Sequence, residues 1–187
     1  MDSSDPRRKR LGQLFQEKAV LHGEFTLSSG NKSSYYFDGR RVTHDPEGVL
    51  LVGALVSELL EEVGVEAVGG PATAANAIVT ATQMAAAQRG WPLAAFYVRS
   101  EAKQYGTGRV VEGSPPESPG ARVAIVEDTI TTGGSVLKAI EAVEGLGLIV
   151  AKVVVLVDRR EGGSEALRAK GYDVVALFEA DENGNIV

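Results

Sequence analysis

The sequence of 187 residues contains no cysteine, which excludes disulfide bonds, a catalytic thiol and a zinc site with cysteine ligands. Long apolar runs are absent too, because charged or small residues interrupt each hydrophobic stretch before it could span a bilayer. Basic residues are in the minority: 19 lysines and arginines face 25 aspartates and glutamates, for a net charge of −6, which argues against a nucleic-acid partner. We therefore expect a cytoplasmic protein that binds neither a membrane nor nucleic acid.

The run from Arg7 to Arg10 is a local exception to the acidic balance. An amphipathic pattern follows it, without the apolar segment that a secretory signal requires, so we interpret the run as a solvated helix start. The length of the chain suits one well-filled core, and we expect residues 1–187 to form a single domain.

Strand and helix patterns alternate along most of the chain. Asp45 and Pro46 are typical of a helix N-cap and first turn, and the apolar stripe that follows has helical spacing. Strands are predicted at 65–68, 93–98, 123–126, 150–157 and 174–178, and helices at 8–20, 46–63, 73–88 and 136–143. This alternation predicts an α/β fold with a central parallel sheet, helices on both faces and a binding site at the carboxyl ends of the strands.

One interval, from about 99 to 120, breaks the alternation. It contains Gly106, Gly108, Gly113 and three prolines, with no sustained period of either kind. A loop of this length inside a compact domain is usually functional, and we predict a mobile lid. A solvated surface segment whose charges only aid solubility is the alternative.

The most informative segment runs from Val123 to Ser135 and reads V-A-I-V-E-D-T-I-T-T-G-G-S. A buried strand ends there in Glu127 and Asp128, and a small polar turn leads into the next helix. Gly133 and Gly134 let successive amides close around a phosphate at a helix N-terminus, and neighbouring hydroxyls add donors. The two carboxylates would accept hydrogen bonds from the adjacent hydroxyls of a ribose. The segment predicts a ribose 5-phosphate site, unless the acids only cap the helix and the glycines form an ordinary turn.

This segment resembles the phosphoribosyl pyrophosphate (PRPP) motif of type I phosphoribosyltransferases, and the chain from about Phe25 to Arg160 is similar to orotate phosphoribosyltransferases. The resemblance implies the type I phosphoribosyltransferase fold, with a small N-terminal hood at about 20–40. It also implies PRPP contacts at Glu127, Asp128, Thr129, Ile130, Thr131, Thr132, Gly133, Gly134 and Ser135.

The implied reaction transfers the phosphoribosyl group of PRPP to orotate, giving orotidine 5'-monophosphate and pyrophosphate in pyrimidine biosynthesis. Mg²⁺ should be required, held mostly by PRPP and water with Asp128 as a protein ligand. The family resemblance further implies a homodimer whose lid reaches the neighbouring active site.

The lid sequence V-R-S-E-A-K-Q-Y-G-T-G-R is similar to the catalytic loop of the same family, whose pattern is R-K-x-x-K-x-H-G. Arg99 and Lys103 match this pattern, while Ser100 replaces a lysine and Tyr105 replaces the histidine. The resemblance makes Arg99, Lys103 and Asp128 the catalytic residues, and adds Arg99, Lys103 and Tyr105 to the PRPP contacts. Ser100 removes one positive charge, and a phenol donates a hydrogen bond but cannot act as an imidazolium.

The orotate site is predicted from two further segments. Arg159 follows a strand and could hold a carboxylate in a bidentate grip; an ion pair with Asp158 is the alternative. The hood pattern S-G-x-x-S-x-Y-Y is matched by Ser29, Gly30, Ser33, Tyr35 and Tyr36. By resemblance, the orotate contacts are Thr131, Arg159, Tyr36 and Phe37, although core packing is the alternative for alternate members of the aromatic trio.

The segment G-G-P-A-T-A-A-N from Gly69 to Asn76 also follows a predicted strand and opens a helix. Its amides could bind pyrophosphate, with Gly70, Thr73, Ala74 and Ala75 as the candidates. It lacks the Gly-Lys-Ser/Thr ending of a P-loop, and some family members carry a lysine near Ala74.

Two other functions remain open at this point. The first is a phosphoribosyltransferase for another base, such as a purine. The second is a regulatory protein that binds PRPP but has a weakened lid, since Ser100, Tyr105 and Ala74 each lack a charge that relatives carry.

Overall fold

The computed structural model describes residues 4–26, 32–101 and 109–187. Among these residues, six strands form the central sheet in the order β5-β4-β3-β6-β7-β8. Their bounds are β3 Ala67–Gly69, β4 Ala94–Val98, β5 Val111–Gly113, β6 Arg122–Ile130, β7 Ile149–Asp158 and β8 Val174–Glu179. All neighbours are parallel except β5, which runs antiparallel to β4. The predicted parallel sheet is confirmed, with an antiparallel edge strand added.

The described end of the predicted lid, residues 109–120, contains a strand that its composition did not suggest. Within it, Val111 pairs with Val98 and Gly113 pairs with Phe96 in the β4–β5 ladder. Gly113 has φ 104°, and a side chain there would meet the Ala95 carbonyl oxygen at 2.8 Å. The glycine therefore serves close strand packing, and residues 111–113 of the predicted lid belong to the sheet.

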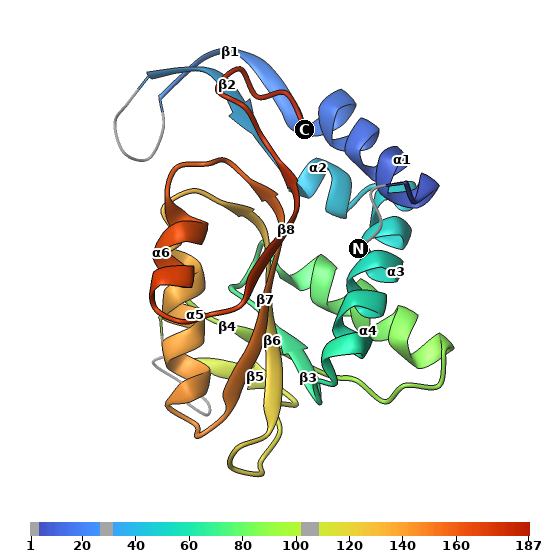
Figure 1. Ribbon diagram of the computed structural model, residues 1–187, viewed down its shortest axis with the longest axis vertical. Helices are drawn as coiled ribbons and strands as arrows, with labels where there is room; N and C mark the ends of the chain where they lie inside the picture. The colour runs from blue at the N-terminus through green and yellow to red at the C-terminus, as the bar shows by residue number, and fades with distance from the viewer. Residues whose placement is uncertain (1–3, 27–31, 102–108) are drawn as a thin grey trace.

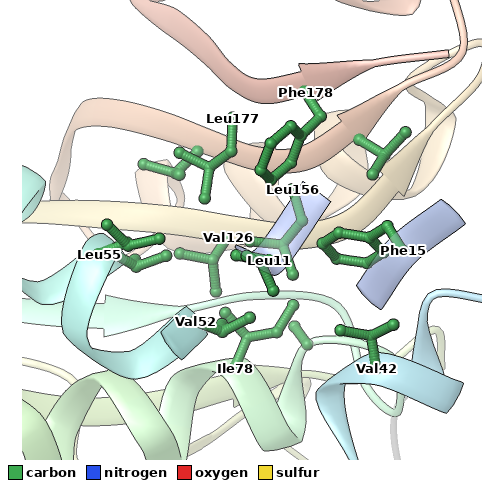
Figure 2. Close-up of a cluster of buried hydrophobic side chains, with 14 of the residues drawn as sticks. Leu11, Phe15, Val42, Val52, Leu55, Ile78, Val126, Leu156, Leu177 and Phe178 are labelled. Carbon is green, nitrogen blue, oxygen red and sulfur yellow. The ribbon is translucent and has the colours of Figure 1, made fainter. Parts of the chain in front are cut away.

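Helices cover both faces of the sheet (Figure 1). On one face lie α1 Pro6–Leu14, α3 Pro46–Val63 and α4 Asn76–Gln88, and on the other α5 Gly134–Glu144 and α6 Gly163–Ala169. Residues of β6 alternate between the two cores, with Val126 on the α3 side and Ile125 on the α5 side. Figure 2 shows the first core, where Val52, Leu55 and Ile78 of the helices meet Val126 and Leu156 of the sheet.

The start of α3 follows the sequence prediction. Asp45 is the N-cap and accepts hydrogen bonds from the amides of Glu47 and Gly48, and Pro46 occupies the first turn. Gly64, with φ 71°, ends the helix in the left-handed conformation.

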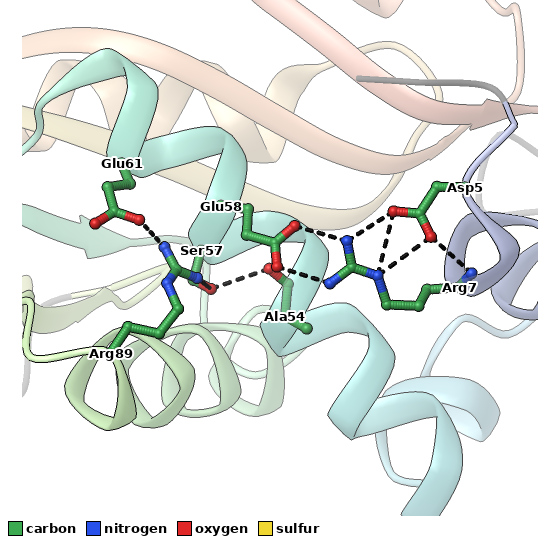
Figure 3. Close-up of polar contacts among 7 residues, drawn as sticks. All are labelled: Asp5, Arg7, Ala54, Ser57, Glu58, Glu61 and Arg89. Carbon is green, nitrogen blue, oxygen red and sulfur yellow. Dashed lines mark hydrogen bonds and ion pairs between the residues drawn. The ribbon is translucent and has the colours of Figure 1, made fainter.

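Polar contacts tie α3 to both neighbouring helices (Figure 3). Arg7 of α1 donates two hydrogen bonds to Glu58, at 2.7 and 2.8 Å. On the other side, Arg89 at the end of α4 donates to Ser57 at 2.7 Å and pairs with Glu61. Because the ion pairs are partly exposed, each contributes little to the free energy of folding. We expect them mainly to fix the orientation of the helices relative to one another.

The hood differs from the irregular segment that the sequence suggested. β1 Val20–Thr26 and β2 Lys32–Phe37 pair antiparallel, next to the C-terminus in Figure 1. The predicted helix 8–20 is α1 followed by a π-helical turn, Phe15–Ala19, and the short α2 Arg40–Thr43 follows the hood. Phe15 stacks on Phe37 with ring centroids 5.8 Å apart, so an apolar contact anchors β2 to the main domain.

The sheet order creates a switch point between β3 and β6. From β3 the chain moves outward to β4 and β5, then returns to β6 on the other side of β3 and continues to β7 and β8. Loops that leave the carboxyl ends of β3 and β6 diverge there, which leaves a crevice where α/β proteins bind ligands.

Candidate active site

A cavity of about 350 Å³ lies at the carboxyl ends of β3 and β6, under the hood. Eight residues predicted from the sequence line it: Tyr36, Phe37, Thr73, Ala74, Asp128, Thr129, Thr131 and Arg159. Asp38, Gly39 and Arg40 also line it and were not predicted. A larger cavity of about 1020 Å³ lies between the segment from Arg109 and the end of α5, but none of the predicted site residues contributes to it.

The two adjacent acids of β6 have different surroundings. Asp128 lines the cavity, whereas Glu127 is 3% exposed and accepts a hydrogen bond from Ser135 Oγ at 3.1 Å. Successive side chains of a strand alternate between its faces, and β6 extends through both acids to Ile130. Asp128 is therefore the acid that lines the cavity, and the expectation that both acids accept from one ribose diol stays a prediction.

Burial raises the pKa of Glu127 to about 8, and the negative charge of Asp128 adds to the effect. The pKa of Asp128 is also raised, mainly by burial. Two neighbouring carboxyls with raised pKa values favour shared protonation in the unliganded site.

We predict that Glu127→Gln stabilises the protein at high pH. Because the pKa of Glu127 is raised from 4.5 in the unfolded chain to about 8 in the fold, the native state binds more protons between these values and loses stability as pH rises. The amide avoids this loss, so the variant should gain about 1 kcal/mol or more over the parent at pH 8 and little at pH 4.5. Urea unfolding at both values measures the difference.

The exposed Glu62 provides the control for this comparison. Glu62→Gln should leave the pH dependence of the unfolding free energy unchanged. A Glu127→Gln variant whose gain is equal at both pH values would contradict the assignment of a raised pKa to Glu127.

The unpredicted segment Asp38–Arg40 closes one side of the cavity. Asp38 accepts a hydrogen bond from Arg40 Nε at 2.8 Å, and this contact lowers the pKa of Asp38. A Cβ on Gly39 would lie 2.9 Å from Asp128 Oδ2, so glycine allows the hood to approach that carboxylate. Asp-Gly after an aromatic strand is a turn signal, which is the sequence feature that could have identified this segment.

The turn after β6 leads directly into the N-terminus of α5, as the sequence predicts. Gly133 has φ 79°, α5 starts at Gly134, and the first amides of a helix have no intrahelical acceptor. The Gly163 amide donates to the Thr131 carbonyl at 2.8 Å, and a Cβ on Gly163 would lie 2.4 Å from that oxygen. The start of α6, which the sequence did not predict, therefore holds the turn in place.

The residues of the predicted PRPP motif differ in whether their side chains have a polar atom available for a ligand. Thr129 Oγ1 is buried without a hydrogen-bond partner among the described residues, and Thr129 lines the cavity. Ile130 is 1% exposed and packs in the core beside α5, so only its backbone is near the site. Thr132 is exposed, and the Ser135 hydroxyl is occupied by Glu127.

Arg159 reaches the cavity from the end of β7. Its side chain is 8% exposed, and its guanidinium lies 5.0 Å from the centroid of the Tyr35 ring. Nη2 contacts Glu161 at 3.1 Å and the Tyr35 hydroxyl at 3.4 Å, while Nε is buried without a partner among the described residues. Among the described residues the ion pair of Arg159 is with Glu161 and not with Asp158, and Asp158 accepts a hydrogen bond from the amide of Arg160 at 2.8 Å.

The aromatic trio of the hood alternates as a strand requires. Tyr35 and Phe37 are buried, and Tyr36 is 37% exposed with its ring 5.7 Å from that of Phe25. Phe37 borders the cavity, but its ring stacks on Phe15 in the core. Tyr35 matches the predicted hood pattern, with core packing as the alternative; it is buried and its ring and hydroxyl contact the Arg159 guanidinium.

The loop after β3 approaches β6 closely. A Cβ on Gly70 would lie 2.1 Å from the Val126 carbonyl oxygen, so glycine is required by this packing. Thr73 and Ala74 line the cavity. Ala75 is fully buried and its amide donates to the Pro71 carbonyl at 3.1 Å, so the prediction that Ala75 contacts pyrophosphate is not supported by this geometry.

Several predicted lid and hood residues lie outside the described part of the chain. These are Lys103 and Tyr105 in the lid, and Ser29 and Gly30 in the hood. Arg99 is described and lines a second, smaller cavity beside the first.

Comparison with known proteins gives the family. The model of the phosphoribosyl transferase domain matches residues 42–177. An orotate phosphoribosyltransferase of Streptomyces avermitilis is 45% identical over 181 residues, which cover 96% of this chain and 98% of that protein. The chain belongs to the orotate phosphoribosyltransferase family. An orotate phosphoribosyltransferase of Thermococcus gammatolerans, 37% identical over 95% of this chain and 92% of its own length, extends the similarity to a more distant relative.

Solved structures of orotate phosphoribosyltransferases agree. The Mycobacterium tuberculosis enzyme in complex with Fe(III) dicitrate superposes with a TM-score of 0.82 at 40% identity, over 93% of this chain and 97% of that one. The same enzyme in complex with PRPP gives a TM-score of 0.78 at 36% identity, over 93% and 96%. The type I phosphoribosyltransferase fold expected from the sequence is confirmed.

Proposed function

We propose that the cavity beside β3 and β6 transfers the 5-phosphoribosyl group of PRPP to orotate, giving orotidine 5'-monophosphate and pyrophosphate. This is a step of pyrimidine biosynthesis. The observation that carries the proposal is the meeting of Asp128, Thr131 and Arg159 around one cavity of an orotate phosphoribosyltransferase fold. Asp128 suits the ribose hydroxyls of PRPP, and the turn that contains Thr131 suits its 5-phosphate. The buried guanidinium of Arg159 suits the carboxylate of orotate.

The ribose 5-phosphate end of PRPP fits the turn from Thr131 to Ser135. Amides at the start of α5 would donate to the phosphate oxygens. Asp128 would accept from the ribose hydroxyls, and Thr129 Oγ1, buried and unpartnered within the described residues, offers a further polar atom to the sugar.

Asp128 also fits the transition state. As the bond between C1 of the ribose and the pyrophosphate oxygen breaks, positive charge develops on the ring, and a carboxylate on its edge stabilises that charge. The new bond forms between C1 and N1 of orotate, which loses its proton. The pyrophosphate leaves toward Thr73 and Ala74 on the other side of the cavity.

Orotate carries a carboxylate on a flat ring. The Arg159 guanidinium is a suitable partner because its planar donors match a carboxylate and its Nε has no other acceptor among the described residues. Tyr36, the exposed aromatic of the hood, supplies a flat surface at the cavity rim.

The donor set is compatible with Mg²⁺ carried by PRPP. No cluster of three or more potential ligand side chains occurs in the described ranges, yet Asp128 lines the cavity with its pKa raised by burial, and a cation would relieve that cost. Mg²⁺ is commonly bound by one or two carboxylates together with substrate phosphates. Asp128 would hold the ion, which would neutralise charge on the pyrophosphate.

We further propose a cytoplasmic homodimer whose lid, with Lys103, completes the neighbouring site. This rests on the family resemblance of the lid sequence. No helix in the described part of the chain is long and apolar enough to cross a membrane. Mixing Lys103→Ala subunits with Asp128→Asn subunits tests the shared site, because one competent site per heterodimer would restore activity. Absence of any recovery would argue against a shared lid.

The activity itself is tested by following the loss of orotate absorbance in the presence of PRPP and Mg²⁺. We expect turnover with orotate, no product with adenine, hypoxanthine or uracil, and loss of turnover when a chelator removes the metal. Product from a purine instead of orotate would indicate a different base. Binding of PRPP without any turnover would indicate the regulatory alternative.

A further inference from the structure

A second cavity, of about 230 Å³, adjoins the active site. It is bordered by Ala72 of the loop after β3, by Arg99 and Ser100 after β4, and by Ser135 and Lys138 of α5. Ala72 precedes Thr73, which lines the active-site cavity, and Ser135 ends the PRPP motif. The two cavities therefore share the loops that the proposed function assigns to PRPP.

Backbone hydrogen bonds hold the walls of this second cavity. The amide of Ala72 donates to the Val98 carbonyl at 2.7 Å, and the amide of Val98 donates to the Gly70 carbonyl at 2.8 Å. The Arg99 amide donates to Val110 at 2.9 Å. Ser100 and Arg99 are thus placed beside the loop after β3 by the sheet itself.

The charged side chains that line this cavity are all positive. Arg99 and Lys138 contribute two positive charges, and no carboxylate lines it. Throughout the described ranges, no ion pair neutralises either side chain. In a chain with a net charge of −6, two cations that line one small cavity without a carboxylate among its lining residues indicate a site for an anionic group.

We propose that Lys138 binds the pyrophosphate end of PRPP and supplies a positive charge that the lid lacks at Ser100. This inference rests on the proposed function. Ser100 stands where the lid pattern given above has a lysine, and the structure brings Lys138 from α5 to the same cavity that Ser100 borders. The two positions are 38 residues apart in the sequence, so only the fold places the charge of one beside the other.

The exposure of Lys138 sets the expected effect of its removal on PRPP and pyrophosphate binding. Lys138 is solvent-exposed, so its attraction for pyrophosphate is partly screened. A charge-assisted contact of this kind corresponds to about a 5-fold to 20-fold difference in affinity. Lys138→Ala should raise KM for PRPP and the inhibition constant of pyrophosphate by that factor, and leave KM for orotate within about two-fold.

Two further variants distinguish charge from structure. Lys138→Arg should retain most of the affinity, and Ser100→Lys in the Lys138→Ala background should restore it, because the new lysine enters the same cavity. Lys170→Ala, which removes an equal charge after α6, should change none of these constants. Affinity for orotidine 5'-monophosphate, which lacks pyrophosphate, should be unchanged in every variant.

Unchanged KM for PRPP and unchanged pyrophosphate inhibition in Lys138→Ala would overturn the inference while leaving the proposed function intact. Weaker binding of orotidine 5'-monophosphate would also overturn it, because Lys138 would then contact the 5'-phosphate. Absence of turnover in the parent enzyme would instead refute the proposed function, and direct calorimetry of pyrophosphate with parent and Lys138→Ala protein would still test the cation site.

Discussion

Replacing Asp128 with asparagine is expected to lower kcat by about 10²-fold to 10³-fold, because an isosteric amide cannot stabilise positive charge on the ribose ring. Asp128 is the acid of β6 that lines the cavity, while Glu127 turns toward Ser135. KM for orotate should change little, since Arg159 is untouched. Steady-state kinetics with both substrates varied would separate these effects.

Asp38→Asn is the matched control, because it makes the same chemical change on the same cavity. The Asp38 carboxylate is already paired with Arg40, which lowers its pKa, whereas burial raises that of Asp128. We expect a loss of less than about 10-fold in kcat for Asp38→Asn. If both variants lost activity equally, Asp128 would contribute only to the net charge of the cavity, and a specific contact with the ribose ring would be contradicted.

The second large effect is expected at Arg159. Arg159→Ala should lower kcat/KM for orotate by about 10²-fold to 10³-fold, because the alanine removes both the charge and the planar donors that hold a carboxylate. Arg159→Lys should still lose about 10-fold or more, since an ammonium cannot reproduce a bidentate contact. The buried guanidinium rests on Tyr35, so its position is set before the substrate arrives.

Arg160→Ala provides the neighbouring control, since Arg160 is exposed and pairs with Glu179 away from the cavity. Its activity should remain within about three-fold of the parent. Calorimetry of PRPP binding to Arg159→Ala checks that the fold and the sugar site persist. Orotate kinetics that are the same in the Arg159 and Arg160 variants would rule out a carboxylate contact at Arg159.

Much of the architecture was predictable because local patterns agreed with the global fold. The apolar strands and the helix stripe after Asp45 lie where their periodicity placed them. The hood was harder to predict because its antiparallel pair, β1 with β2, has no continuous apolar alternation. β5 was missed because a three-residue edge strand leaves little pattern among glycines and prolines.

The site was predictable to a similar degree, with errors of a consistent kind. The motif residues Asp128 and Thr131 and the distant Arg159 line one cavity. The errors concern burial: Glu127 and Ile130 belong to the same motif, but their side chains are only 3% and 1% exposed. A sequence motif names neighbours along the chain, and strand geometry decides which of them face the ligand.

The amino-acid sequence by itself determined the α/β class, the anion turn at Gly133 and the chemistry available at Asp128 and Arg159, because these depend on residue type and short-range spacing. Only the tertiary structure decided that Tyr35 supports Arg159, that Gly39 brings the hood against Asp128, and that Lys138 shares a cavity with Ser100. Each of these contacts joins segments far apart in the chain, and such contacts are set by the packing of whole elements rather than by any local preference.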